Sequence, residues 1–523
     1  MTHVTQSQDE VFRFLSDPAT HDGASVTRID THGAAVFLAG PRVYKIKRAV
    51  RFPFLDYSSV DKRKAACEAE LQVNRAFAPQ LYRRVVPITK DANGRLALGA
   101  DGATLDWALE MERFDETATL DHLAEDGRID AKLADSLGHA VAKAHDDAAA
   151  VAAGPWIAAL SDYIAQNDEA FGEWPDLFPP DDVERQTQAC TRSLARIRPL
   201  LEARGAAGLI RRGHGDLHLG NIVLIDDKPV LFDAIEFDPV IASGDVLYDL
   251  AFLLMDLIAR DLTGAANIVL NRYLAQTARD SDLDALAALP LFMTIRAAIR
   301  AKVTAAKLAQ AGDGKRRDIE DSARAYFQLA SRLIAPARPQ MFGVGGLSGT
   351  GKSLLARMLA AHIAPPPGAI LLRSDVTRKR MFDVAETEKL PQEAYTPEVT
   401  TRVYAKLCEQ AARIVKAGHS VIVDAVFAKE NERDLLAEAA RGANTEFAGL
   451  FLTAGLDTRV RRVGGRTDDA SDADAKVARQ QADYDLGRMD WRQIDASGTP
   501  DETVKNALAA ISLADARSDA KGA

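Results

Sequence analysis

Residues 346–353 read G-L-S-G-T-G-K-S, and they decide the fold of the second half of the chain. The run F-G-V-G-G before Ser348 is typical of a buried strand, and S-L-L-A-R-M-L-A after Lys352 has the apolar spacing of a helix. A glycine-rich loop in this position turns backbone N–H groups towards phosphates, while its lysine adds positive charge and its serine hydroxyl reaches Mg²⁺. The pattern therefore predicts a nucleotide triphosphate site. Its residues are Gly346, Leu347, Ser348, Gly349, Thr350, Gly351, Lys352 and Ser353.

The sequence around this loop alternates strands with helices. Apolar runs predict strands at 342–346, 369–373, 420–424 and 447–452, and segments with helical spacing separate them. This alternation is typical of a doubly wound α/β fold, in which helices cover both faces of a parallel sheet. We therefore expect a P-loop domain in the second half of the chain.

The domain limits follow from a change in composition. The segment I-A-P-A-R-P-Q ends a long alanine-rich helical region, and the first strand of the P-loop domain begins directly after it. We expect a first domain at 1–335, a linker at 336–340, the P-loop domain at 341–512 and a flexible tail at 513–523.

The first domain divides into two lobes of different structure. Residues from about 25 to 112 read as short strands with turns, interrupted by one helix from about Ser59 to Ala76. From about 113 to 335 the spacing is helical, except for a strand pair near 222–224 and 230–232. The pattern predicts an α+β domain with a sheet-based small lobe and a helical lobe.

Composition limits the possible partners. The formal net charge of −10 argues against a broad surface for nucleic acid or anionic membranes, although one confined basic groove would be compatible with it. The three cysteines have no paired spacing, the ten histidines form no cluster, and neither a signal peptide nor a membrane span is evident. We expect a cytoplasmic protein without disulfides, and metals other than Mg²⁺ or Mn²⁺ are not indicated.

Two segments of the helical lobe carry phosphotransfer chemistry. H-G-D-L-H-L-G-N at 214–221 precedes the strand pair, and L-F-D-A-I-E-F-D begins at the end of its second strand. Phosphoryl transfer from ATP needs a carboxylate that orients the acceptor hydroxyl, and an Asn and an Asp that hold Mg²⁺ on the phosphates. Asp216, Asn221 and Asp233 supply these groups in that order.

These segments resemble the aminoglycoside phosphotransferase and choline kinase family, whose marks are H-G-D-x-x-x-x-N and a metal-binding Asp after the next strand. The resemblance covers about residues 25–335. It implies a two-lobed protein-kinase-like fold with ATP and Mg²⁺. It also implies that Asp216 is the catalytic base and that Asn221 and Asp233 are metal ligands. The first turn, T-H-G-A-A, has a single glycine and departs from the glycine-rich cover of protein kinases.

A Lys-Glu ion pair in the small lobe should align the ATP phosphates. R-V-Y-K-I-K places Lys45 and Lys47 on one face of a strand, and C-E-A-E-L places Glu68 and Glu70 on the helix that follows. We favour Lys45 with Glu70 as nucleotide-binding residues. Strand alternation does not choose between the two lysines, and the helix offers two acids.

The ends of the second and third predicted strands of the P-loop domain carry candidate acceptor and metal groups. Asp375 and Arg378 lie one helical turn apart, where the carboxylate can take a hydroxyl proton and the guanidinium can bind an acidic group. Asp424 ends the third strand, a position suited to the water shell of Mg²⁺. A capped helix with an exposed ion pair would also explain Asp375 and Arg378.

A candidate lid follows in R-R-V-G-G-R, which brings Arg462 and Arg466 close before an Asp-rich turn at 468–474. Arginines on a closing lid can stabilise the transferring phosphoryl group and exclude water. A basic surface turn balanced by nearby acids is the alternative.

Over about residues 341–510 the chain resembles the P-loop kinase group that includes polynucleotide 5′-kinases, gluconate kinases and zeta-type toxins. By that resemblance Asp375 is the acceptor base, Arg378 clamps the acceptor, Asp424 lies on the metal side, and Arg462 and Arg466 form the lid. Arg433 matches a recurring arginine of the group.

The combined prediction is a fused enzyme with two ATP and Mg²⁺ sites, each transferring phosphate to the hydroxyl of a small molecule. Polynucleotide 5′-kinase activity of the second domain is an alternative, which the acidic balance disfavours. A nucleotide-sensing regulator with a non-catalytic first domain is another. Acceptor identity and oligomeric state are left open, because acceptor specificity lies in the shape of pockets built from distant loops.

Overall fold

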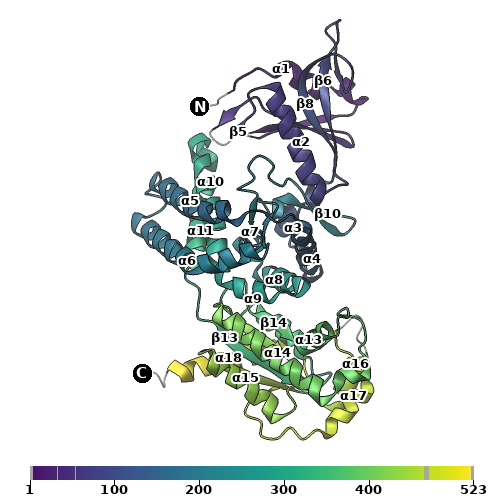
Figure 1. Ribbon diagram of the computed structural model, residues 1–523, viewed down its shortest axis with the longest axis vertical. Helices are drawn as coiled ribbons and strands as arrows, with labels where there is room; N and C mark the ends of the chain where they lie inside the picture. Colours follow the sequence, from purple (N-terminus) through teal and green to yellow (C-terminus); the bar gives the residue numbers. More distant parts are fainter. Residues whose placement is uncertain (1–3, 32, 53–54, 465–469, 520–523) are drawn as a thin grey trace. The chain divides into compact units, whose positions relative to one another are not determined.

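The computed structural model describes residues 4–31, 33–52, 55–464 and 470–519 (Figure 1). The chain divides by packing into two compact units. Unit 1 consists of Met1–Asn167 and Arg198–Asp256, and unit 2 of Asp168–Ile197 and Leu257–Ala523. The limits of these units reflect packing, and the sequence-based domain limits stay predictions.

Unit 1 contains the predicted sheet-based lobe. Its six-stranded antiparallel sheet has the order β1-β2-β3-β8-β6-β7. The strands are β1 Val26–Asp30, β2 Ala34–Ala39, β3 Arg42–Lys47, β6 Tyr82–Lys90, β7 Leu96–Leu98 and β8 Ala103–Glu112, and a short hairpin joins β4 Arg51–Phe52 to β5 Leu55–Asp56. Helix α1 is Asp9–Ser16, and helix α2, Val60–Phe77, begins after Ser59, whose side chain accepts a hydrogen bond from the Lys62 N–H.

The remainder of unit 1 forms the platform for the first candidate site. A hairpin of β10 Ile222–Ile225 and β11 Lys228–Leu231 confirms the predicted strand pair. Asp226 and Asp227 form its turn with positive φ angles of 49° and 58°. The other elements are α3 Leu120–Glu125, α4 Ala131–Asp147, β9 Ile210–Arg212 and β12 Ser243–Asp245. Helices α5 Ala153–Gly172, α6 Pro180–Ala206 and α7 Val246–Ala259 contribute residues to both units.

In unit 2, the helices that precede the predicted linker pack in one compact unit with the parallel sheet. Its helices in that region are α8 Thr263–Thr277, α9 Asp280–Ala285, α10 Leu289–Ala306 and α11 Asp313–Leu333. Phe171, Phe178 and Phe327 form a buried aromatic cluster with ring centroids 4.6–5.2 Å apart.

The sheet of unit 2 is parallel, with five strands in the order β14-β15-β13-β16-β17. The strands are β13 Gln340–Gly346, β14 Ile370–Arg373, β15 Val421–Asp424, β16 Glu446–Thr453 and β17 Arg492–Asp495. The helices are α12 Lys352–Ala360, α13 Ser374–Met381, α14 Pro397–Lys416, α15 Glu430–Gly442, α16 Leu456–Gly464, α17 Ala475–Gln480 and α18 Pro500–Asp519. The predicted fold class is confirmed, and helix α18 includes residues 513–519, where the sequence predicted a tail.

The indole of Trp491 lies on a glycine surface of this sheet. A Cβ atom at Gly343 of β13 or Gly449 of β16 would come within 2.3 Å of its ring carbons, and one at Gly345 within 3.2 Å. Because no side chain projects there, the buried indole contacts the strand backbone directly.

The described ranges contain no candidate transmembrane helix, since none of their helices combines the necessary length with sufficient hydrophobicity.

Candidate functional sites

Asp216 and Asn221 lie together on the loop before β10. The Asn221 side-chain amide donates to the Asp216 carbonyl oxygen over 2.9 Å and to Asp216 Oδ2 over 3.0 Å. Gly215 makes the tight turn before them with φ = 82°, and a Cβ atom there would lie 2.9 Å from Ala242 Cα. The His218 ring stands 3.5 Å from the Asp216 carboxylate. The loop therefore places a partly exposed carboxylate beside an amide, as the motif predicts.

Asp249 of α7 fixes the backbone of this loop through its carboxylate. Its carboxylate accepts hydrogen bonds from the backbone N–H groups of His214 and Gly215, over 2.8 and 2.9 Å, and approaches His145 Nε2 at 3.2 Å. Asp249 was missed in the sequence, although an acid within the apolar helix α7 was a usable signal. A buried carboxylate in such a helix needs polar partners, and the loop supplies them.

His214 connects the loop to the segment that carries Asp233. Its Nε2 atom bonds to the Phe232 carbonyl oxygen over 2.8 Å, and the ring is buried. Burial lowers the pKa of His214 below its usual range, although Asp249 and Asp216 oppose this shift. A neutral ring with a protonated Nε2 fits this hydrogen bond. His214 thus links the loop to the segment that carries Asp233.

Asp233 has a left-handed backbone, with φ = 61°. Its N–H donates to the Tyr82 hydroxyl over 3.0 Å, and its Oδ1 lies 2.7 Å from Lys45 Nζ. The Phe232 N–H in turn donates to the Asn221 carbonyl oxygen over 2.9 Å. Asp216, Asn221 and Asp233 are therefore connected through short contacts, and Asp233 faces the lysine of β3.

In place of a single Lys-Glu pair, the small lobe has two lysines that share one acid. Glu70 Oε1 lies 2.7 Å from Lys45 Nζ, and Glu70 Oε2 lies 2.5 Å from Lys47 Nζ. Burial alone would raise the pKa of Glu70, but the two ammonium groups overcome it and lower the pKa to about 2. Glu68 instead faces solvent beside Lys64. The structure thus selects Glu70 and lets both lysines share it.

Glu236 completes this network and was missed in the sequence. Its Oε1 atom lies 2.5 Å from Lys47 Nζ and accepts a hydrogen bond from the Tyr57 hydroxyl over 3.3 Å. It follows Asp233 by three residues in the segment L-F-D-A-I-E-F-D. The two lysines of β3 therefore each bridge Glu70 to one acid of this segment.

The phosphate loop of unit 2 has the backbone that its glycines predict. Gly346, Gly349 and Gly351 have φ angles of 143°, 87° and 95°, and α12 begins at Lys352. A Cβ atom at Gly349 would lie 2.4 Å from the Arg459 carbonyl oxygen. These positions accept only glycine without strain. The N-terminus of α12 thus faces the loop, as an anion site requires.

Two side chains from after the loop support its backbone. Arg459 Nε of α16 donates to the Ser348 carbonyl oxygen over 3.0 Å, and the Ser348 N–H donates to Gln481 Oε1 over 2.7 Å. Both side chains are buried. Both were missed in the sequence, because nothing in their local sequence marks a contact with residues more than a hundred positions away.

The predicted acids of the second site meet at the carboxyl ends of neighbouring strands. Arg373 of β14 pairs in register with Asp424 of β15, and their side chains approach to 3.5 Å. Burial raises the pKa of Asp375 above its usual range, and the Asp424 carboxylate adds to this rise. Lys352, Arg373 and a hydrogen bond from Ser471 act in the opposite direction. Asp375 thus lies within electrostatic reach of both Lys352 and Asp424.

Arg378 is buried against the segment that follows α13. Its Nη1 atom donates to the Ala394 carbonyl oxygen over 2.7 Å, and its guanidinium carbon lies 5.0 Å from the centre of the Tyr395 ring. In this conformation the side chain supports the 394–395 segment. Its predicted role as an acceptor clamp stays a prediction.

The segment after the predicted lid contacts the acceptor side of the site. Asp472 accepts hydrogen bonds from the Tyr395 hydroxyl over 2.5 Å and from the Leu390 N–H over 3.0 Å. It also lies 3.1 Å from Lys379 Nζ. Asp472 therefore ties this segment to the chain that follows α13.

Arg462 lines a small cavity beside the phosphate loop. It donates to the carbonyl oxygens of Ala496 and Gly498 over 2.8 and 3.1 Å. The cavity has a volume of about 180 Å³. Its other lining residues are Thr350, Gly351, Leu354, Leu355, Met358, Pro500 and Thr503. Most of these were missed, since apolar helix positions look like core in a sequence. Arg466 lies outside the described residues.

Arg433 has a structural position. It is buried and donates to the carbonyl oxygens of Phe427, Ala428, Leu486 and Arg488 over 2.6–3.0 Å. It fastens the chain after β15 to the segment before β17.

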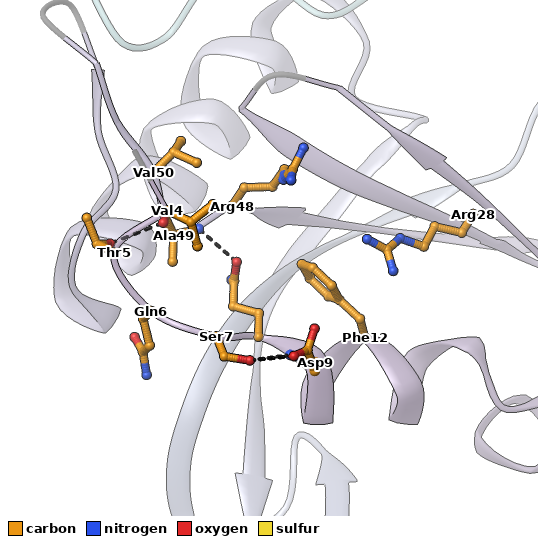
Figure 2. Close-up of a pocket in the computed structure, with 11 residues that line it drawn as sticks. Val4, Thr5, Gln6, Ser7, Asp9, Phe12, Arg28, Arg48, Ala49 and Val50 are labelled. Carbon is orange, nitrogen blue, oxygen red and sulfur yellow. Dashed lines mark hydrogen bonds between the residues drawn. The ribbon is translucent and has the colours of Figure 1, made fainter. Parts of the chain in front are cut away.

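Another cavity, of about 420 Å³, opens on the small lobe (Figure 2). Phe12 and Arg28 line it, with the Arg28 guanidinium carbon 4.3 Å from the centre of the Phe12 ring. Figure 2 also shows Ser7 hydrogen-bonded to Asp9 at the start of α1. None of the predicted site residues lines this cavity.

Comparison with known proteins gives two domain matches and several relatives. Over 490 residues, the chain is 26% identical to an uncharacterized protein of Mycobacterium tuberculosis. The aligned region covers 91% of this chain and 94% of the relative. The structure of a gluconokinase from Sinorhizobium meliloti is 21% identical, with a TM-score of 0.25. The match covers 34% of this chain and 93% of the gluconokinase chain. The structure of an aminoglycoside phosphotransferase from Alicyclobacillus acidocaldarius is 16% identical, with a TM-score of 0.36. The match covers 61% of this chain and 92% of the phosphotransferase chain.

The family models match separate parts of the chain. Residues 39–289 match the phosphotransferase enzyme family, and residues 341–485 match the AAA domain. Both predicted resemblances are thereby confirmed. The chain therefore combines a segment that matches the phosphotransferase enzyme family with a segment that matches the AAA domain, and these two matches support its assignment as an ATP-dependent kinase.

Proposed function

We propose that this kinase has two separate nucleotide sites and transfers phosphate from ATP to hydroxyl groups of small molecules. The observation that carries the proposal is the first site, where Asp216, Asn221 and Asp233 lie on connected loops and Lys45 joins Asp233 to Glu70. These five groups are the ones that phosphoryl transfer from ATP uses: a base, two metal-side groups and a Lys-Glu pair.

The donor sets fit Mg²⁺ at both sites. Mg²⁺ binds one or two carboxylates together with phosphate oxygens and water, and the side-chain oxygens of Asn221 and Asp233 offer such a set. At the second site, the hydroxyl of Ser353 and the carboxylate of Asp424 would hold it. The ion would neutralise charge on the ATP phosphates when bound.

The protein groups then have distinct roles. At the first site Asp216 orients the acceptor hydroxyl and accepts its proton, while Lys45 and Glu70 align the phosphates. At the second site Lys352 and the N–H groups of the phosphate loop bind the phosphates, and Asp375 serves as the base. The cavity beside Arg462 adjoins the loop and is suited to the adenine.

The test is ADP release across a library of sugars, aminoglycosides, amino alcohols and 5′-hydroxyl oligonucleotides. Wild type is compared with Asp216→Asn and Lys352→Ala, each of which removes a required group from one site. We expect small-molecule hydroxyls to stimulate turnover, and each variant to lose only one class of acceptor. Stimulation by oligonucleotides alone, lost in Asp375→Ala, would replace the proposal with polynucleotide 5′-kinase activity. ATP binding at both sites without stimulated turnover would indicate a nucleotide-sensing regulator.

A further inference from the structure

Helix α8 covers the edge strand of the parallel sheet in unit 2. Strand β14 lies at the edge, and its neighbour on one side is β15. An exposed edge leaves unpaired N–H and C=O groups. Here Asn271 Oδ1 accepts from the Leu371 N–H over 2.7 Å, and Asn271 Nδ2 donates to the Ala369 carbonyl oxygen over 3.1 Å. The Asn271 amide thus occupies the place of a peptide group in a further strand.

Asn267 adds a second bond at the same point. This buried side chain donates to the Ala369 carbonyl oxygen over 3.1 Å. A Cβ atom at Gly368 would lie 2.7 Å from Asn267 Nδ2, and Gly368 has φ = 124°. The close approach of α8 therefore depends on the absence of a side chain at Gly368.

The contacts of α8 continue beyond the strand into the segment that follows it. Arg272 Nη1 lies 3.2 Å from Glu386 Oε2, and Arg380 Nη2 donates to the Ala275 carbonyl oxygen over 2.6 Å. The Glu386 carbonyl oxygen also accepts from Lys379 Nζ over 2.7 Å. Helix α8 thus holds both ends of the chain between β14 and residue 386, which includes the candidate acceptor residues Asp375 and Arg378.

Helix α9 anchors the next helix of the P-loop domain. Arg413 of α14 makes a two-pronged contact with Asp284, at 2.9 and 2.8 Å, and Lys406 Nζ lies 2.7 Å from Asp280. The position of α14 matters to the site because Thr400 at its start approaches Arg378 Nη1 at 3.4 Å. The acceptor side is therefore fixed from two helices.

We propose that α8 and α9 form a structural wall of the second kinase site, in which Asn271 and Arg272 are positioning residues for Asp375 and Arg378. Both helices lie within residues 39–289, the part that matches the phosphotransferase enzyme family. Residues of one kinase domain thus set the acceptor geometry of the other. The activity arm of the test below rests on the proposed function, and the exchange arm does not.

The exchange arm measures amide hydrogen exchange in the full chain. Asn271→Leu has nearly the same volume and removes the hydrogen bonds of Asn271 with the Ala369 carbonyl oxygen and the Leu371 N–H. We expect exchange in peptides covering 370–386 to become at least about fivefold faster, because two net hydrogen bonds are lost. Gln276→Leu on exposed α8 surface is the matched control and should leave exchange unchanged. Unchanged exchange of 370–386 in Asn271→Leu overturns the proposal.

The activity arm uses Arg272→Ala, which removes a partly exposed side chain of α8 and disturbs the fold less than Asn271→Leu. ADP release is measured in the Asp216→Asn background, with Lys352→Ala defining zero. We expect KM for the acceptor to rise about tenfold with ATP affinity unchanged, and Arg272→Lys to restore most of the loss because it keeps the charge near Glu386. An unchanged KM overturns the positioning role of Arg272. Absence of acceptor turnover in wild type contradicts only the proposed function. The exchange result then decides whether α8 holds the 370–386 segment in place.

Discussion

Glu70 is the central acid of the first site, because its one buried carboxylate contacts two buried or partly buried lysines. Removing it leaves both ammonium groups without their shared partner, a costly arrangement away from water. Its depressed pKa of about 2 gives the sign of the pH effect. The stabilisation is present above the ordinary Glu pKa of about 4.3 and is lost as the pH falls from there through the folded-state pKa.

We therefore expect Glu70→Gln to lower the free energy of unfolding by about 3 kcal/mol at neutral pH, measured by urea denaturation. Glu68→Gln, two positions earlier on the same helix and exposed, is the matched control and should leave stability nearly unchanged. Equal losses in the two variants would contradict the central position of Glu70.

Asp375 predicts a pH dependence of the second activity. Burial raises its pKa, and a base must be ionised to accept a proton. In the Asp216→Asn background, kcat/KM should therefore fall with decreasing pH at values above the usual Asp pKa of about 3.9. Ser471→Ala removes a hydrogen bond that lowers this pKa and should move the acidic limb to higher pH. An acidic limb that does not respond to Ser471→Ala would argue against Asp375 as the base.

The motif residues were predictable from the sequence, whereas their partners were not. H-G-D-x-x-x-x-N specifies Asp216 and Asn221 by spacing alone, because one short loop carries both. Glu70 was favoured over Glu68 in the sequence, but only the orientation of the helix separates the two acids, and Gln481 required a contact between residues 133 positions apart. Side chains that act through tertiary contact leave no local pattern.

At the scale of elements, helix α7 shows how an apolar helix supports the loop that carries the predicted base Asp216. Its carboxylate at Asp249 accepts from two backbone N–H groups of the H-G-D turn, so a core element fixes the position of Asp216. Each oxygen of Asp249 accepts from one of these N–H groups, so an asparagine would place its NH2 group against one loop N–H in either orientation of the amide.

We expect Asp249→Asn to reduce turnover at the first site about a hundredfold while ATP affinity is retained, because misplacement of a catalytic group by about 1 Å is enough for such a loss. Turnover and nucleotide binding should be measured in the Lys352→Ala background. Asp147→Asn, on the exposed end of α4 beside Lys143, should behave as wild type. Parallel loss of ATP binding and turnover would instead indicate a general folding defect.

Strand prediction succeeded for the apolar strands of the parallel sheet and failed for one edge strand, β17. The apolar run at 420–424 corresponds to β15 Val421–Asp424, in the centre of the sheet. Strand β17, Arg492–Asp495, was not predicted, since R-Q-I-D has one apolar residue. An edge strand has little apolar surface to bury, and its pairing with β16 supplies the order that its sequence does not reveal.

At the scale of the whole molecule, the chain should bind two nucleotides. Equilibrium dialysis with a non-hydrolysable ATP analogue and Mg²⁺ is expected to give about two sites per wild-type chain and about one in Lys352→Ala, because the P-loop lysine contacts the phosphates directly. A single site in wild type would contradict the two-site proposal.

The presence of two kinase types was evident from motifs, but the packing units were not. Residues 257–335 read as a continuation of the first domain, yet they share a compact unit with the P-loop sheet. Polar contacts such as Arg413 with Asp284 create this association, and charged residues on helix surfaces are too common in sequences to identify one.

Trp491, seated on the glycines of β13 and β16, makes the second domain accessible to fluorescence. The other tryptophans are Trp107, Trp156 and Trp174, and replacing them with phenylalanine leaves one tryptophan, whose emission can be excited selectively at wavelengths that tyrosine does not absorb. Strand β13 runs directly into the phosphate loop, and the indole contacts its backbone without an intervening side chain. The emission of such a single-tryptophan protein would therefore report nucleotide binding at the second site in real time, without signal from the first.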